Sequence, residues 1–138
     1  MESIFTKIIN NQVEAYVIDK TENFITILAK DQITHGHTLV IPIVPVGNFT
    51  KMNSSDYGNL QIYAQKIAKV LELAFPNKKR IVLNIVGFEI DHVHIHLIPC
   101  DSIAEAFGSV PEVLDQLTMI QIRNKIQAKL TSKNLQER

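Results

Sequence analysis

Three of the five histidines in this 138-residue chain stand at every second position, as His92, His94 and His96 in the stretch DHVHIHLIP. An apolar residue follows each of them, so the stretch has the alternation of a β-strand with one polar face. Alternate side chains of a strand share a face, and a step of two residues spans roughly 6.5 Å. Adjacent imidazoles can therefore reach one small ligand, and we expect the three rings to form a single site.

Two chemistries fit this spacing. Neutral imidazoles on alternate strand positions, joined by a third ligand such as His35 or His37, could bind Zn²⁺ tetrahedrally. Alternatively, a neutral imidazole nitrogen could attack a phosphoryl group and form a phosphohistidine. Its neighbours would then orient it, stabilise charge on the phosphate oxygens and protonate the leaving group. Histidine suits these catalytic roles because its pKa lies near neutrality, and the spacing alone leaves both chemistries open.

The composition favours an ordinary globular protein. The 14 basic and 14 acidic side chains leave no net charge, whereas a protein that coats nucleic acid or an anionic membrane needs an excess of Lys and Arg. The single cysteine, Cys100, excludes an internal disulfide and fits a reducing compartment. Neither a signal peptide nor a membrane-spanning run is evident. We expect a cytoplasmic protein with neither a membrane nor a nucleic-acid polymer as its partner.

The elements around the histidines predict an α+β fold with one antiparallel sheet. Alternating or apolar runs indicate five strands, over 15–20, 23–30, 36–42, 80–86 and 92–99. Apolar residues at helical spacing indicate helices over 3–10, 54–75 and 110–130, the last with an apolar face of Val113, Leu117, Ile120 and Leu130. Ser3 and the residues SSD at 54–56 are the expected caps of the first two helices. No linker or repeat divides the chain, so residues 1–138 are expected to form one domain with a core over about 3–100 and a frayed tail over 131–138.

The stretch HVHIHLI resembles the histidine triad motif, H-φ-H-φ-H-φ-φ, of the histidine triad (HIT) nucleotide hydrolases and transferases. The stretches SIFTKIINNQVEAYVI at 3–18 and GHTLVIP at 36–42 are similar to other segments of that family. GFEIDHVHIHLIP is similar to a bacterial subgroup that reads G-x-E-V-P-H-x-H-x-H-L-I-P. The resemblance implies a HIT-like fold whose five-stranded sheets join across a homodimer. It also implies cleavage at the α-phosphorus of nucleotide phosphoramidates, dinucleoside polyphosphates or nucleotidyl esters.

The same resemblance implies a role for each site residue. His94 would be the nucleophile that becomes nucleotidylated, and His96 would contact the phosphate and assist the leaving group. His92 would support the geometry of the site, and His37 would complete the set by hydrogen bonding near the nucleophile. Apolar side chains would hold the base of the nucleotide, namely Ile4, Phe5, Ile8, Ile27, Leu28 and Leu39. That chemistry needs no metal or other cofactor. Some members bind a structural zinc through C-x-x-C, and the stretch SIFT in its place predicts none here.

Three residues depart from the family pattern. Ala29 stands where the family usually has an Asp or Asn that hydrogen-bonds the ribose. Glu89 stands where many members have a Ser or Thr that donates to the phosphate, and Asp91 replaces the proline of the bacterial subgroup. Two alternatives to a HIT-type enzyme therefore stay open: a nucleotide-binding or regulatory protein with little turnover, and a zinc-dependent hydrolase that uses H-x-H-x-H.

Overall fold

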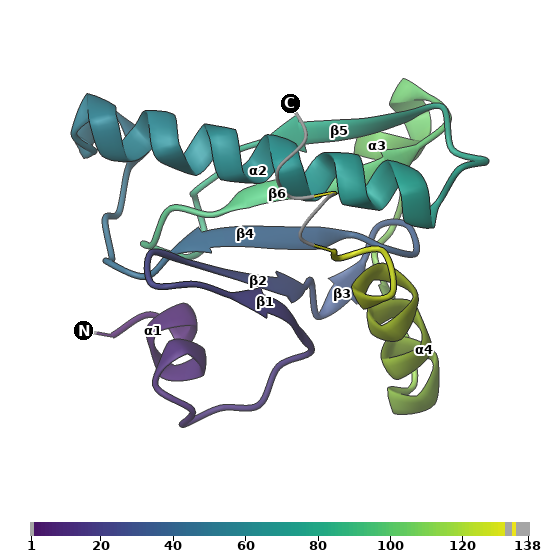
Figure 1. Cartoon of the computed structure of the whole chain (residues 1–138), viewed down its shortest axis with the longest axis horizontal. Coiled ribbons are helices and arrows are strands. Elements are labelled where there is room, and N and C mark those ends of the chain that lie inside the picture. The colour runs from purple at the N-terminus through teal and green to yellow at the C-terminus, as the bar shows by residue number, and fades with distance from the viewer. Residues whose placement is uncertain (1, 132–133, 135–138) are drawn as a thin grey trace.

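A five-stranded antiparallel sheet forms the centre of the molecule in the computed structural model, which describes residues 2–131 and 134 (Figure 1). Its strands, in spatial order, are β1 (Val17–Lys20), β2 (Phe24–Leu28), β4 (Thr38–Pro42), β6 (Ile95–Cys100) and β5 (Arg80–Asn84). The helices are α1 (Ile4–Ile9), α2 (Ser54–Ala74), α3 (Ile103–Gly108) and α4 (Gln116–Gln127), with a short 3-10 turn at Phe49–Lys51. The predicted α+β class with an antiparallel five-stranded sheet is confirmed. Among the described residues, no helix is long and apolar enough to cross a membrane.

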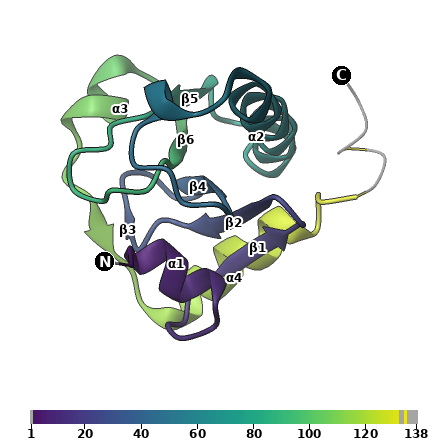
Figure 2. The same ribbon diagram turned by 90° about the vertical axis from the view of Figure 1, so that its left-hand side faces the viewer.

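The helices cover the two faces of the sheet unequally. Figure 2 shows α2 on one side of the sheet and α1 and α3 on the other. The larger apolar core lies beneath α2 and also takes in α4, whose Met119, Ile122 and Ile126 are buried there. A second cluster lies beneath α1, and a third, with Ala106 of α3, lies over β6. The face beside α1 and α3 is therefore covered by two short helices of six residues each.

Helix α2 shows why the apolar spacing predicted a long helix. Its buried side chains recur every three or four residues and face the sheet: Leu60, Tyr63, Ala64, Ile67, Val70, Leu71 and Ala74. The helix ends before Pro76, which cannot continue it. Its cap is Asn53, whose Oδ1 accepts from the backbone N–H of Asp56 at 3.0 Å, so the cap expected within residues 54–56 is one residue too late.

The C-terminal segment differs from the single helix predicted over 110–130. Asp115 caps α4 by accepting from the backbone N–H of Thr118 at 2.7 Å, so the helix begins at Gln116. Residues Glu112–Val113 form β7 instead, and β7 pairs with β3 (Asp31–Gln32) in a small second sheet. Val113 lies in β7 and the buried face of α4 is formed by Met119, Ile122 and Ile126, so the predicted apolar face is wrong for Val113 and Leu117, which are 77% and 65% exposed. The predicted frayed tail, 131–138, lies outside the described residues except for 131 and 134.

The strand that carries the histidines also begins later than predicted. β6 starts at Ile95, so His96 lies in the strand and His92 and His94 precede it. Ile95 pairs with Val40 of β4, and the ladder between these strands ends there. The backbone N–H of Val93 donates instead to Val46, in the loop after β4, at 2.7 Å. The histidines are therefore held by a loop and by their own side-chain hydrogen bonds, and one pleated strand does not hold all three.

Two glycines provide a matched test of this backbone. Gly36 has φ +99°, and a Cβ there would lie 2.5 Å from the ring of Phe75. Gly36→Ala is expected to lower the free energy of unfolding by about 1–3 kcal/mol because it adds strain and a clash. Gly58 lies inside α2 with nothing within 4 Å of an added Cβ, so Gly58→Ala is expected to raise that free energy by about 0.5–1 kcal/mol. Urea unfolding of both variants measures the difference, and a stable Gly36→Ala protein would contradict the loop geometry.

Candidate active site

Four of the five histidines come together on the face of the sheet that α1 covers. His96 in β6 lies directly opposite Leu39 of β4, and His37 immediately precedes β4. The ring centroid of His96 lies 4.9 Å from that of His94 and 5.2 Å from that of His37. His92 is completely buried behind them, whereas His35 is exposed and outside the group. The structure thus gathers the four histidines that the sequence singled out, from two segments that are far apart in the chain.

The hydrogen bond of His94 decides which of its nitrogens is reactive. Nδ1 lies 2.8 Å from the backbone carbonyl oxygen of His92. A carbonyl can only accept, so Nδ1 carries the proton of the neutral ring, and Nε2 carries a lone pair. The tautomer assigned from this partner is the one that a nucleophilic imidazole needs.

His92 is held from both sides. Its Nε2 lies 2.8 Å from the carbonyl oxygen of Pro42, so Nε2 donates, and Nδ1 accepts from the hydroxyl of Ser3 at 2.8 Å. The same Ser3 oxygen caps α1 by accepting from the backbone N–H of Thr6 at 3.1 Å, as the sequence predicted. Phe5 packs edge-on against His92 and His94, with centroid separations of 5.8 Å and 4.9 Å. Helix α1 therefore fixes the residue whose carbonyl orients His94.

A chain of hydrogen bonds links Ile33, His37 and His96. The backbone N–H of Ile33 lies 3.3 Å from Nδ1 of His37, which must accept it. Nε2 of His37 then carries the proton and donates to Nδ1 of His96 at 2.9 Å. The proton of His96 is left on Nε2. His94 therefore offers a lone pair, while the adjacent His96 offers an N–H.

Burial keeps these rings neutral. Desolvation, reinforced by the neighbouring histidines, lowers the pKa of His37 and of His96 to about 4 each. Burial also lowers the pKa of His92 and of His94. At neutral pH His94 therefore has a lone pair available on Nε2, and the ring of His96 is neutral.

This donor set does not suit a three-histidine metal site. Both nitrogens of His92 and of His37 already have hydrogen-bond partners, as does Nδ1 of His94 and of His96. Two Nε2 atoms remain, one fewer than the protein ligands of a typical catalytic zinc site. Within residues 2–131 and 134, no group of three or more His, Cys, Asp or Glu side chains is placed to hold a metal.

Asn84 is a site residue that sequence reasoning missed. It ends β5 directly opposite His96, so the two side chains share a face of the sheet. Its side-chain Oδ1 is buried and has no hydrogen-bond partner among the described residues. A buried acceptor without a partner in the protein is free to accept a hydrogen bond from a ligand or from water. An asparagine in the run RIVLN gave no signal by itself, because only the pairing of β5 with β6 places it next to a histidine.

The residues expected to hold a base divide between the two faces. Phe5, Ile8, Ile27 and Leu39 belong to one buried cluster on the histidine face, together with Ala29. Ile4 lies on α1 and is 40% exposed. Leu28 points to the other face, into the core beneath α2, because neighbouring residues of a strand alternate. The structure therefore does not bring Leu28 together with the histidines.

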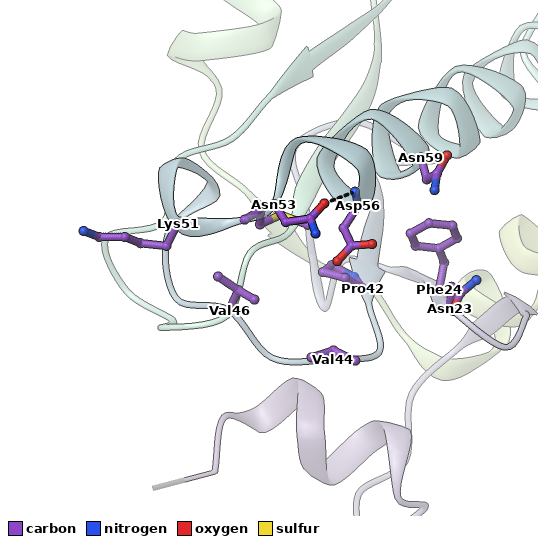
Figure 3. A pocket seen from close by; sticks show the side chains of 10 residues that line it. Asn23, Phe24, Pro42, Val44, Val46, Lys51, Asn53, Asp56 and Asn59 are labelled. Carbon is purple, nitrogen blue, oxygen red and sulfur yellow. Dashed lines mark hydrogen bonds between the residues drawn. The ribbon is translucent and has the colours of Figure 1, made fainter.

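One pocket of the described residues lies away from the histidines. A pocket of about 180 Å³ lies between the start of α2 and the ends of β2 and β4 (Figure 3). Asp56 and Asn59 of α2 project toward Phe24 across it, and Lys51 points away. None of the histidines lines this pocket, although its wall includes Pro42, whose carbonyl accepts from His92. The reactive groups, and not the hollow, define the candidate site.

Comparison with known proteins agrees with this architecture. A family model described as the HIT domain matches residues 10–103. An uncharacterised HIT-like protein of Methanocaldococcus jannaschii is 33% identical over 121 residues, which cover 83% of this chain and 94% of that protein. The adenosine 5′-monophosphoramidase of Saccharomyces cerevisiae is 28% identical over 96 residues, which cover 70% of this chain and 61% of that enzyme. A zinc-bound histidine triad family protein from Mycobacterium smegmatis has a TM-score of 0.82, with 22% identity and 99% coverage of both chains.

The chain therefore belongs to the HIT domain family, as its motifs predicted. Its fold is that of other HIT-family structures. Since one relative is named a phosphoramidase, the family includes enzymes that act on nucleotides.

The buried neutral histidines predict the pH dependence of stability. A ring with a pKa near 4 in the folded state and 6.5 in the unfolded state binds more protons when unfolded, between these values. The free energy of unfolding should therefore fall as the pH falls from 6.5 to 4, by about 1.4 kcal/mol per pKa unit for each ring. His37→Gln removes one such ring and should flatten this slope. Denaturant unfolding across this pH range tests the prediction, and equal slopes in both proteins would contradict it.

Proposed function

We propose that the protein is a HIT-type nucleotide hydrolase or nucleotidyltransferase that acts at the α-phosphorus through a nucleotidyl-His94 intermediate. The observation that carries this proposal is the hydrogen bond from His94 Nδ1 to the carbonyl of His92, which leaves the Nε2 lone pair beside the N–H of His96. A nucleophile and a proton donor in adjacent neutral rings are the two groups that displacement at phosphorus needs.

The proposed reaction proceeds in two displacements. The anionic phosphate favours a positive charge on the adjacent His37–His96 pair, which takes up one proton from solvent when the substrate binds. The lone pair of His94 Nε2 attacks the α-phosphorus, and the bond to the leaving group breaks as His96 Nε2 donates a proton to that group, which leaves the pair neutral. The phosphorylated ring of His94 then carries a positive charge, which the carbonyl of His92 stabilises through Nδ1–H. A water molecule attacks the same phosphorus, its proton passes to His96 Nε2, and the bond to His94 breaks. The nucleoside monophosphate leaves, the His37–His96 pair releases its extra proton to solvent, and both rings regain their starting tautomers.

Substrate binding follows from the residues around this pair. The apolar side chains of Phe5, Ile8, Ile27 and Leu39, with Ile4 at the surface of α1, offer a face for a base. The buried Oδ1 of Asn84, opposite His96, can accept a hydrogen bond from the attacking water or from the N–H of an amine leaving group. Ala29 lies in the same apolar cluster and offers no side-chain acceptor to ribose hydroxyls. That residue favours the second candidate, a nucleotide-binding protein with little turnover.

The activity prediction uses adenosine 5′-phosphoramidate as substrate. The wild-type protein should release AMP, because His94 and His96 supply both the nucleophile and the proton. His94→Ala should lower kcat by roughly 10³-fold or more, since no other lone pair of the site is oriented in this way. His35→Ala, a change of the same kind at an exposed histidine, should leave the rate unaltered. The assay follows AMP by chromatography.

Two results would count against this mechanism. If His94→Ala retained the wild-type rate, His94 would not be the nucleophile. If the wild-type protein bound AMP but released none from the phosphoramidate, the binding protein with little turnover would replace the enzyme.

We also propose that the protein forms a homodimer through β5 and α2. β5 is an edge strand, and an unpaired edge is a template for pairing with another strand. Ile62 of α2 and Leu83 of β5 are 50% and 42% exposed, and together with Ile81 they line one shallow apolar hollow. An apolar face that adjoins an open edge supports the joined sheet that the family resemblance implies.

Analytical ultracentrifugation tests the dimer. The wild-type protein should sediment as a dimer, and Leu83→Arg should shift it to monomer because a charge would be buried at the edge. Phe107→Arg is the matched control, since Phe107 is 66% exposed on α3, on the other face of the sheet. A monomeric wild-type protein, or a dimeric Leu83→Arg variant, would refute this interface.

A further inference from the structure

The loop between β2 and β4 is built around one buried amide. The side chain of Gln32 donates from Nε2 to the carbonyl of Ala29 at 2.7 Å and to that of His37 at 2.8 Å. Its Oε1 accepts from the backbone N–H of Gly36 at 2.9 Å. Gln32 is 1% exposed, and both of its donors and its acceptor are engaged within its own loop. A satisfied buried amide of this kind fixes local geometry, because any lost contact leaves a buried polar group unpaired.

The backbone of Gln32 is held from the opposite side. Gln32 forms β3 with Asp31, and it pairs with Glu112 of β7. Thr34, two residues later, donates to the carbonyl of Pro99 in β6 at 2.6 Å. The C-terminal segment and β6 thus hold the outside of the loop, while the amide of Gln32 fills its interior.

Ile33, the residue after Gln32, begins the chain of hydrogen bonds that runs through His37 to His96. The N–H of Ile33 is the donor that keeps Nδ1 of His37 unprotonated. The backbone carbonyl of Asp31 has the opposite effect on His37. As a hydrogen-bond acceptor it favours a proton on the ring and so raises the pKa of His37. If the Ile33 N–H moved away, His37 could place its proton on Nδ1 and present a lone pair at Nε2. His96 would then have to donate from Nδ1, and its Nε2 would hold no proton for a leaving group.

We propose that Gln32 is a positioning residue that sets the tautomers of His37 and His96, and thereby supplies the proton on His96 Nε2. Its action runs through the loop: the amide fixes the carbonyls of Ala29 and His37, and the position of the Ile33 N–H follows. The consequence for catalysis rests on the proposed function. The tautomers themselves are a property of the resting protein and can be measured without a substrate.

The test combines Gln32→Leu with imidazole NMR. Long-range ¹H–¹⁵N spectra of the full chain at pH 7 should show the Nε2–H tautomer for His37 and His96 in the wild type. Gln32→Leu, of similar size but without the amide, should give mixed tautomers at both rings, with His94 unchanged. The kcat for adenosine 5′-phosphoramidate should fall roughly 10²-fold with little change in KM, because proton donation is lost while binding residues stay in place.

A buried polar residue elsewhere is the matched control. Thr26 is also completely buried, and its hydroxyl donates to that of Tyr63 at 3.1 Å on the α2 side of the sheet. Thr26→Val should lower stability but leave the tautomers of His37 and His96 as in the wild type. This comparison separates a positioning role from a general loss of stability.

Should Gln32→Leu not fold, Gln32→Met serves in its place, because its unbranched side chain has nearly the shape of Gln but lacks the amide donors and acceptor. The proposal is overturned if a folded Gln32 variant retains pure Nε2–H tautomers. It is equally overturned if His37 of the wild type carries its proton on Nδ1. If the tautomers shift as expected but the wild type hydrolyses no phosphoramidate, the proposed function fails while the role of Gln32 stands.

Discussion

The hydrogen bond from Nδ1 of His94 to the carbonyl of His92 is the contact that gives this site its chemical direction. Because Nδ1 holds the proton of the neutral ring, the lone pair lies on Nε2. The carbonyl is useful only because His92 does not move: it is fully buried, and both of its ring nitrogens are bonded. Much of the surrounding structure can be understood as support for that one residue.

The support comes from segments far apart in the sequence. The hydroxyl of Ser3 caps α1 and also donates to His92, so the position of the helix and that of the ring depend on each other. The carbonyl of Pro42, at the end of β4, accepts from the other nitrogen. The chain of hydrogen bonds through Ile33, His37 and His96 is separate from these contacts and begins in the loop before β4. Two separate networks therefore set two tautomers, one for His94 and one for His96.

Membership of the HIT family accounts for the framework of the site, and the departures are local. In this chain hydroxyls stand at the start of α1: the oxygens of Ser3 and Thr6 lie 3.3 Å apart, and Ser3 bonds to His92. Hydrogen bonds hold this corner together. Ala29 is buried with apolar neighbours and has no side-chain hydrogen-bonding group, unlike the Asp or Asn that the family pattern implies at this position.

The sequence by itself determined the periodic features of the protein. Alternation and helical spacing predicted α1, α2 and the five strands of the sheet, because burial of one face follows from residue type and period. Short side-chain spacing predicted that His92, His94 and His96 act together. Periodicity gave wrong boundaries at two places. The cap at Asp115 makes α4 begin later than predicted, and the ladder between β4 and β6 ends at Ile95, so His94 lies outside the strand.

Only the tertiary structure decided which nitrogen of each ring is reactive and which neighbours matter. A tautomer depends on the partner that faces it, and the partners of His92 and His96 come from residues 3, 42 and 37. Asn84 is a site residue only through the register of β5 against β6, and Leu28 lies away from the site because its strand alternates. Gln32 is buried only because β3, β7 and the turn at Gly36 enclose it. Residue types and periods are local properties, whereas pairing, burial and proton positions belong to contacts that only the folded chain makes.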